Sequence, residues 1–126
     1  MKDRTLPELS KSELDIMKIL WKDGRLSARE VHDQISPTYN WAYSTTKTIM
    51  DRMVNKNLLS RRNFHGVFLY EPLITKPMGL AKLVRNFADH VLEMDYGSVV
   101  SLFARSKALT PKEIEELCKL LDSQNK

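Results

Sequence analysis

The sequence is poor in the residues that interrupt or cross-link a chain. It contains four glycines, five prolines and one cysteine in 126 residues. Because glycine and proline are scarce and no segment is low in complexity, the sequence indicates no flexible linker or disordered tail. The single cysteine, Cys118, excludes a disulfide within these residues and a metal site built from several thiolates. We expect a reduced, cytoplasmic protein.

Long apolar runs are also absent. No run approaches the roughly 20 residues that a membrane-spanning helix needs. The charged start, Met1–Thr5, is not followed by the apolar stretch of a signal peptide. We therefore expect no membrane segment and a cytoplasmic location.

The residues that are present favour a small folded domain. Hydrophobic residues make up 42% of the chain and charged residues 29%, which suits a buried core with a charged surface. A chain this short buries its surface incompletely, so a partner subunit is plausible. The net charge of +4 is compatible with an anionic partner but does not establish one.

Helical patterns dominate the first half of the chain. Ser10–Glu13 and Ser27–Glu30 read as capping boxes, each followed by apolar residues at helical spacing. Pro37 is expected to end the second helix. A third helix is expected with Ser44 as N-cap, running to Lys56. Its inward face is Ile49 and Met53 with Met50 and Val54, and Asn57 is its left-handed C-cap.

Two strand-like runs follow the third helix. Residues 58–62 and 67–71 predict a hairpin that turns at His65-Gly66. Three helices followed by a hairpin predict a winged helix-turn-helix domain over residues 1–75. The fold class is therefore mainly α with a small β-hairpin.

The last third of the chain predicts three amphipathic helices, which begin near Pro77, Gly97 and Pro111. They offer more apolar surface than they can cover, so residues 76–126 are expected to form a helical dimerisation domain. The residues expected to mediate dimerisation are Leu80, Leu83, Val84, Phe87, Val91, Val99, Leu102, Phe103, Leu117 and Leu121.

The third helix has the composition of a DNA-reading helix. Short hydroxyl side chains and a lysine fill its first turns, where such a helix enters the major groove and meets bases or phosphates. Lys47 could reach a guanine edge, whereas the arginines and Lys56 are better suited to phosphate. The predicted DNA-binding residues are Ser44, Thr45, Thr46, Lys47, Thr48, Arg52, Lys56, Arg61, Arg62 and His65.

The charge is concentrated in the same region. Between Ala42 and Tyr70 there are five cations and one anion, Asp51, so this segment carries the whole net charge of the chain. A basic patch confined to the reading helix and the hairpin is typical of a nucleic-acid-binding protein.

The residues resemble the penicillinase-repressor family, also called BlaI/MecI, to which the copper-responsive CopY repressors are related. The similarity runs through Leu9–Trp21, Leu26–Val31 and Trp41–Leu59, and returns in Leu102–Ala104 and Leu109–Leu117. The resemblance implies a winged-helix domain, a helical dimerisation domain and a homodimer on a palindromic operator. It implies a transcriptional repressor, with antibiotic-resistance or related stress genes as the expected targets.

Two control mechanisms of the family lack their residues here. The β-lactam branch is controlled by cleavage at an Asn–Phe bond, and the matching position in this chain is Leu102-Phe103. The copper branch carries a Cys-x-Cys pair, and this chain has Cys118 alone. The resemblance therefore does not identify the inducing signal.

Other chemistry is weakly indicated. We expect no enzymatic activity, no cofactor and no metal site, with His32 and His90 on solvated surfaces and Cys118 as a buried, inert thiol. One alternative is a winged-helix protein-interaction adaptor without a specific operator. Another is a regulator that responds directly to a ligand or a metal.

Overall fold

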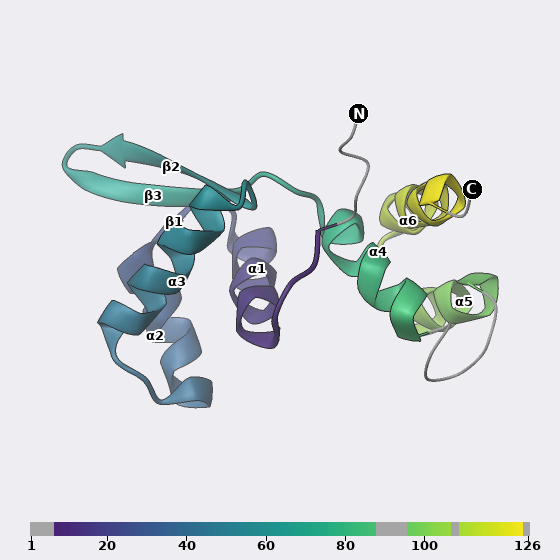
Figure 1. The fold of residues 1–126 in the computed structure, drawn as a ribbon, viewed down its shortest axis with the longest axis horizontal. Helices are drawn as coiled ribbons and strands as arrows, with labels where there is room; N and C mark the ends of the chain where they lie inside the picture. Colours follow the sequence, from purple (N-terminus) through teal and green to yellow (C-terminus); the bar gives the residue numbers. More distant parts are fainter. Residues whose placement is uncertain (1–6, 88–95, 107–108, 125–126) are drawn as a thin grey trace. The chain divides into compact units, whose positions relative to one another are not determined.

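The computed structural model describes residues 7–87, 96–106 and 109–124 of the chain (Figure 1). The chain forms two compact units, Leu9–Thr75 and a second made of Met1–Glu8 with Lys76–Lys126. Within the described ranges, no helix has both the length and the apolar character needed to cross a membrane.

The first unit is a winged helix. Its elements are α1 (Lys11–Asp23), β1 (Leu26–Ser27), α2 (Ala28–Tyr39), α3 (Tyr43–Asn55), β2 (Leu59–Phe64) and β3 (Val67–Pro72). The strands form an antiparallel sheet in the order β1-β3-β2, and the β2–β3 hairpin projects from the helices as the wing (Figure 1). This sheet confirms the predicted fold class. It also contains β1, which the sequence did not predict because a two-residue strand is too short to leave a recognisable pattern.

Local sequence signals set the start of the first two helices. Ser10 accepts a hydrogen bond from the Glu13 N–H, and the Glu13 carboxylate accepts one from the Ser10 N–H. Ser27 and Glu30 repeat this reciprocal pair at the start of α2. Both predicted capping boxes are therefore confirmed.

The core of this unit gathers apolar side chains from every helix and from the sheet. Met50 and Met53 of α3 are fully buried, as predicted, while Ile49 and Val54 are half-buried at its margin. The other fully buried members are Ile16, Met17, Leu20, Val31, Leu59 and Tyr70. This packing fixes which face of α3 points outward.

The prediction that Pro37 ends the second helix was wrong. The helix continues to Tyr39 and ends at Asn40, whose φ of 54° is left-handed. The Tyr39 hydroxyl donates to Asp15 and its ring stacks on Trp41 at 4.4 Å, and these contacts hold the last turn. Pro37 removes the N–H that would bond the carbonyl four residues earlier, and the contacts of Tyr39 offset that loss.

The start of α3 also differs from the prediction. The helix begins at Tyr43 and its N-cap is Ala42, which makes no side-chain cap, so Ser44 is not the N-cap. The first turn of the helix is instead tied to the preceding connection, because the Trp41 indole N–H donates to Thr46 Oγ1 at 2.9 Å. At the other end, Asn57 has a φ of 64°, as expected of a left-handed terminating residue.

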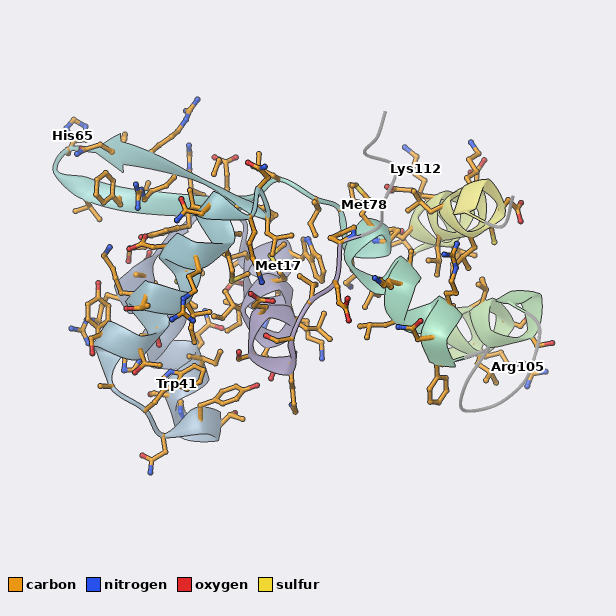
Figure 2. The ribbon with its side chains drawn as sticks, in the orientation of Figure 1. Met17, Trp41, His65, Met78, Arg105 and Lys112 are labelled. Atoms are coloured by element: carbon orange, nitrogen blue, oxygen red, sulfur yellow. The ribbon has the colours of Figure 1, made fainter. Side chains whose placement is uncertain are left out.

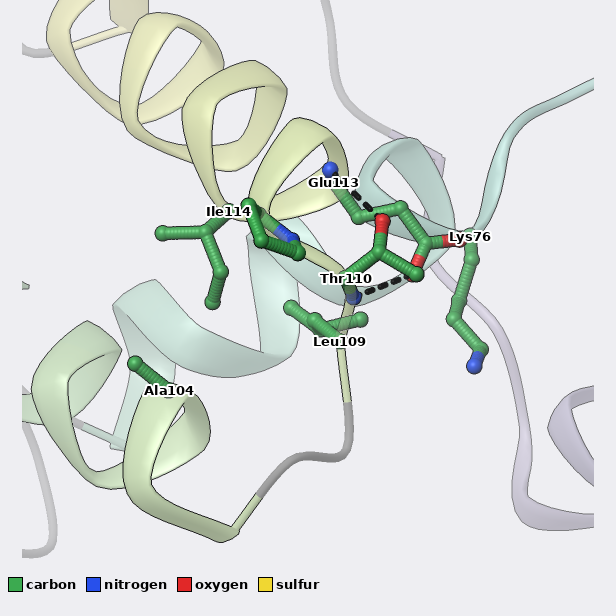
Figure 3. Close-up of a pocket in the computed structure, with 7 residues that line it drawn as sticks. Lys76, Ala104, Leu109, Thr110, Glu113 and Ile114 are labelled. Atoms are coloured by element: carbon green, nitrogen blue, oxygen red, sulfur yellow. Dashed lines mark hydrogen bonds between the residues drawn. The ribbon is translucent and has the colours of Figure 1, made fainter.

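The second unit consists of α4 (Lys76–Phe87), α5 (Tyr96–Ser106) and α6 (Pro111–Gln124). Its core contains Ala81, Val84, Val100, Leu109, Leu117 and Leu121. The predicted capping of the last helix is confirmed, since Thr110 and Glu113 exchange hydrogen bonds (Figure 3). These two residues border an open cavity of about 770 Å³ that Lys76, Leu109 and Ile114 also line.

Cys118 corrects one further expectation, because its side chain is exposed rather than buried. Leu117 and Leu121 of α6 supply the buried stripe of the helix. Cys118 follows Leu117 by one position, about 100° around the helix, which turns it out of that stripe.

Candidate nucleic-acid interface

The outer face of α3 carries most of the side chains predicted to read DNA. Ser44, Thr48 and Arg52 are exposed and four residues apart, so they lie on one helical face. With Thr45 and Ile49 they line a shallow groove of about 320 Å³. The structure thus brings short polar side chains and one guanidinium together along the predicted reading surface.

Thr46 is not part of that surface. Its side chain is fully buried, and its hydroxyl accepts from the Trp41 indole and lies 2.8 Å from His32 Nδ1. The prediction that Thr46 contacts bases was wrong, because the hydroxyl joins α2, the α2–α3 connection and α3. Figure 2 labels Trp41 at this junction. His32 is therefore hydrogen-bonded to Thr46 and does not lie on a simply solvated surface, as had been expected.

A carboxylate at the junction of α3 and the wing binds three donors. Asp51 accepts hydrogen bonds from Lys47 Nζ at 2.8 Å, Arg61 Nη1 at 2.9 Å and the Tyr70 hydroxyl at 2.7 Å. Burial alone raises the pKa of Asp51, but these hydrogen bonds outweigh it, so the net pKa is lowered. The hydrogen bond to Asp51 in turn raises the pKa of Lys47. Two predicted DNA-binding cations are therefore tied to one acid.

Lys56 has a structural partner as well. Its Nζ lies 2.6 Å from the carboxylate of Glu13, which is buried at the start of α1. Burial raises the pKa of Glu13, but the hydrogen bonds from Lys56 and from the Ser10 N–H more than offset it, and the net pKa is lowered. The pair links the end of α3 to the start of α1. About half of the Lys56 side chain stays accessible.

The wing presents basic and apolar groups together. His65 and Gly66 form its turn, with φ values of 53° and 86° that a two-residue turn of this hand requires, and Figure 2 labels His65 at the tip. Arg62 and His65 are exposed. The side chains of Phe64 and Val67 are more than half exposed, which the sequence analysis did not anticipate.

Sequence reasoning also missed a cation outside the hairpin and α3. Arg29 of α2 lies over the ring of Tyr43 at 4.0 Å, beside a groove of about 240 Å³ that Lys47 and Phe68 also line. A guanidinium on an aromatic face is oriented and well suited to phosphate. The charge count between residues 42 and 70 could not include Arg29, because only the fold brings α2 beside α3.

The residues predicted to mediate dimerisation fall into three groups. Leu83, Phe87 and Leu102 expose 39%, 45% and 47% of their surface, and Leu80 is half-buried. Val84, Leu117 and Leu121 are instead packed inside the core of their own unit, where helix-on-helix packing already covers them. Val91 and the side chains of Val99 and Phe103 lie outside the described residues.

Metal-ligating side chains do not cluster in the described part of the chain, where no three of them converge. His90 lies outside the described residues.

Solved structures that the chain resembles include two of BlaI. One is the DNA-binding domain of the repressor BlaI, with 32% identity, 57% of this chain and 88% of that chain covered, and a TM-score of 0.51. The other is the monomeric form of Bacillus licheniformis BlaI in complex with the blaP half-operator. It has 31% identity, covers 59% of this chain and 90% of that chain, and gives a TM-score of 0.52.

Sequence relatives cover nearly the whole chain. The penicillinase repressor of Bacillus licheniformis is 28% identical over 119 residues, which are 94% of this chain and 93% of the relative. The methicillin resistance regulatory protein MecI of Staphylococcus aureus is 27% identical over 122 residues, 97% of this chain and 99% of the relative. The family described as penicillinase repressor matches residues 9–123. The chain therefore belongs to the penicillinase repressor family.

Proposed function

We propose that this protein is a transcriptional repressor that binds a palindromic DNA operator as a homodimer. The observation that carries the proposal is the exposed polar and basic face of α3 beside a basic wing, in a unit that resembles a BlaI structure bound to half-operator DNA. A repressor of this kind is a DNA-binding protein rather than an enzyme. Its target lies in the cytoplasm, which is where the proposal places it.

The proposed mechanism assigns α3 to the major groove. Ser44, Thr45 and Thr48 meet base edges or nearby phosphates from the first turns of the helix, and Lys47 reaches a guanine edge. Phosphate contacts come from the longer cationic side chains and from the wing tip: Arg29, Arg52, Lys56, Arg61, Arg62 and His65. Because most of these contacts are electrostatic, the affinity should fall steeply with salt.

The helical unit supplies the proposed dimer contact. Leu83 and Phe87 lie one turn apart on α4 and expose apolar surface, and Leu102 of α5 does the same. Burying such side chains in a second copy is favourable at roughly 25 cal/mol per Å² of apolar area. A dimer places two reading helices on half-sites about one DNA turn apart. The regulated genes are proposed to be antibiotic-resistance or related stress genes.

The second candidate is a protein-interaction adaptor, which the apolar wing favours. Phe64, Val67 and Phe68 are all more than 40% exposed, and exposed apolar patches often mark protein contacts. An adaptor would bind DNA weakly and without sequence preference.

Selection from a randomised duplex library separates the two candidates. Several rounds of selection with the full chain are followed by fluorescence-anisotropy titration of the enriched and the unselected duplexes at two salt concentrations. Enrichment of a palindrome bound by one dimer supports the repressor. Weak binding that disappears with salt and enriches no sequence favours the adaptor.

Two charge variants sharpen this experiment. Arg52→Ala removes a cation from the outer face of α3 and should reduce the slope of log affinity against log salt by about 0.9. Lys22→Ala, an exposed residue of α1, changes the net charge equally and should leave the slope near the wild-type value. If both variants reduced the salt slope equally, the outer face of α3 would not be a preferred DNA contact.

A further inference from the structure

The basic segment between residues 42 and 70 contains a single anion. Asp51 is that residue, against five lysines and arginines. A protein that only needed phosphate affinity would gain from a neutral residue there, because non-specific DNA binding rises with the number of cations that reach phosphate. The presence of the acid therefore needs its own explanation.

The position of Asp51 is central rather than peripheral. Its carboxylate lies between Lys47 of α3 and Arg61 of β2, within 2.9 Å of the charged nitrogen of each. The Tyr70 hydroxyl of β3 also donates to it. Arg61 is further held over the ring of Phe68 at 4.8 Å. One acid thus fixes two cations from different elements, at the place where the reading helix meets the wing.

The side chains of this cluster are still open to solvent. Asp51 exposes 32% of its side chain, and Lys47 and Arg61 expose 36% each. A phosphate that approaches either cation therefore meets a cluster of three side chains whose net charge is +1, whereas Lys47 and Arg61 without the acid would carry +2. It also competes with a carboxylate that already accepts hydrogen bonds from both side chains.

We infer that Asp51 is a specificity-determining residue that suppresses binding to non-operator DNA by holding and partly neutralising Lys47 and Arg61. This inference rests on the proposed function. In an operator complex Lys47 is committed to a base edge, so only Arg61 is available for an additional phosphate. On non-operator DNA both cations are available, so release from Asp51 favours non-operator binding more than operator binding.

The experiment compares Asp51→Asn with the wild type by anisotropy on the selected operator and on an unselected duplex. The asparagine is nearly isosteric and still accepts the Tyr70 hydrogen bond, but it removes the charge. On the unselected duplex we expect the slope of log affinity against log salt to steepen by about 0.9 or more. For one added phosphate contact, the loss of affinity between 50 and 200 mM salt then grows by about a further 3.5-fold. The ratio of operator to non-operator affinity should fall.

Matched variants keep the inference falsifiable. Asp122→Asn on α6 changes the net charge equally and should leave the slope as in the wild type, whereas Asp51→Glu should lie nearer to the wild type than Asp51→Asn does. If Asp51→Asn fails to fold, Arg61→Gln provides the test in reverse. It leaves Lys47 and Asp51 as a neutral pair, so the slope should become shallower by about 0.9.

The possible failures are distinguishable. If the wild type binds neither duplex, the proposed function is wrong. If the wild type selects an operator but Asp51→Asn has an unchanged slope and an unchanged affinity ratio, the role of Asp51 is wrong and the proposed function stands. A loss of thermal stability with no change of slope would assign Asp51 a purely structural role and would overturn the inference.

Discussion

Replacing Thr46 by valine removes one hydroxyl and keeps the volume of the side chain. The hydroxyl is fully buried and bonds to the Trp41 indole at 2.9 Å and to His32 Nδ1 at 2.8 Å. A buried polar group that loses its partner costs about 1–3 kcal/mol. Two groups lose a partner here, but both Trp41 and His32 are half-buried, so water compensates in part. We expect a loss of about 2 kcal/mol in the free energy of unfolding.

The assay is urea unfolding of the full chain followed by tryptophan fluorescence. The two tryptophans of the chain, Trp21 and Trp41, both belong to the winged-helix unit, so the signal reports on that unit. In thermal unfolding followed by the same fluorescence, a loss of about 2 kcal/mol lowers the melting temperature by roughly 10 °C for a domain of this size. Below the melting transition, the affinity for the selected operator should be unchanged, because Thr46 does not reach the surface.

Thr48→Val is the matched control. Thr48 lies on the same helix but is exposed and lines the outer groove. The change should alter stability by less than about 0.5 kcal/mol and should weaken operator binding. If Thr46→Val instead kept its stability and lost operator affinity, Thr46 would contact DNA and the interpretation of its burial would be refuted.

Three further predictions concern the interface, the dimer and acid stability. Lys47→Ala should weaken binding and relax the base preference by about 1–3 kcal/mol at one position, whereas Arg61→Ala should weaken all sequences evenly; equal losses of specificity in anisotropy titrations would contradict the assignment. Alanine at both Leu83 and Phe87 should shift the dimer toward monomer in sedimentation, and an intact dimer would refute their placement. Because the pKa of Glu13 is lowered in the folded state, its ionised carboxylate stabilises the protein at any pH above its ordinary pKa of 4.5. That contribution to stability is lost as the pH falls through the lowered pKa of the folded state. Glu13→Gln should therefore be less stable at neutral pH and lose less stability on acidification, as measured by melting temperature against pH; parallel curves would argue against the lowered pKa.

The features that could be predicted from the sequence are local ones. The three capping boxes, at Ser10, Ser27 and Thr110, depend on residues three positions apart, and all three form. The left-handed Asn57 and the His65-Gly66 turn are equally local, since they follow from which residues tolerate a positive φ. Periodicity also placed Met50 and Met53 on the buried face of α3, but it counted the half-buried Ile49 and Val54 with them and missed Thr46.

The features that could not be predicted depend on partners distant in the sequence. Thr46 looks like an exposed reading residue until the fold places His32 of α2 beside it. Arg29 joins the candidate interface only because Tyr43 lies under its guanidinium. Periodicity also counted Cys118 into a broad apolar face of the last helix, but the buried stripe there contains Leu117 and Leu121 and leaves Cys118 exposed.

The strand order β1-β3-β2 leaves β2 at one edge of the described sheet. An edge strand offers unpaired backbone groups to any other strand, and charged side chains along it discourage such pairing. Arg61 and Arg62 stand near the middle of β2, between its buried start and the exposed Phe64. The charges of these two side chains should therefore disfavour pairing of β2 with an edge strand of another molecule. Any survey of the wing that removes both must monitor solubility, since a loss of DNA binding there can reflect self-association rather than a missing phosphate contact.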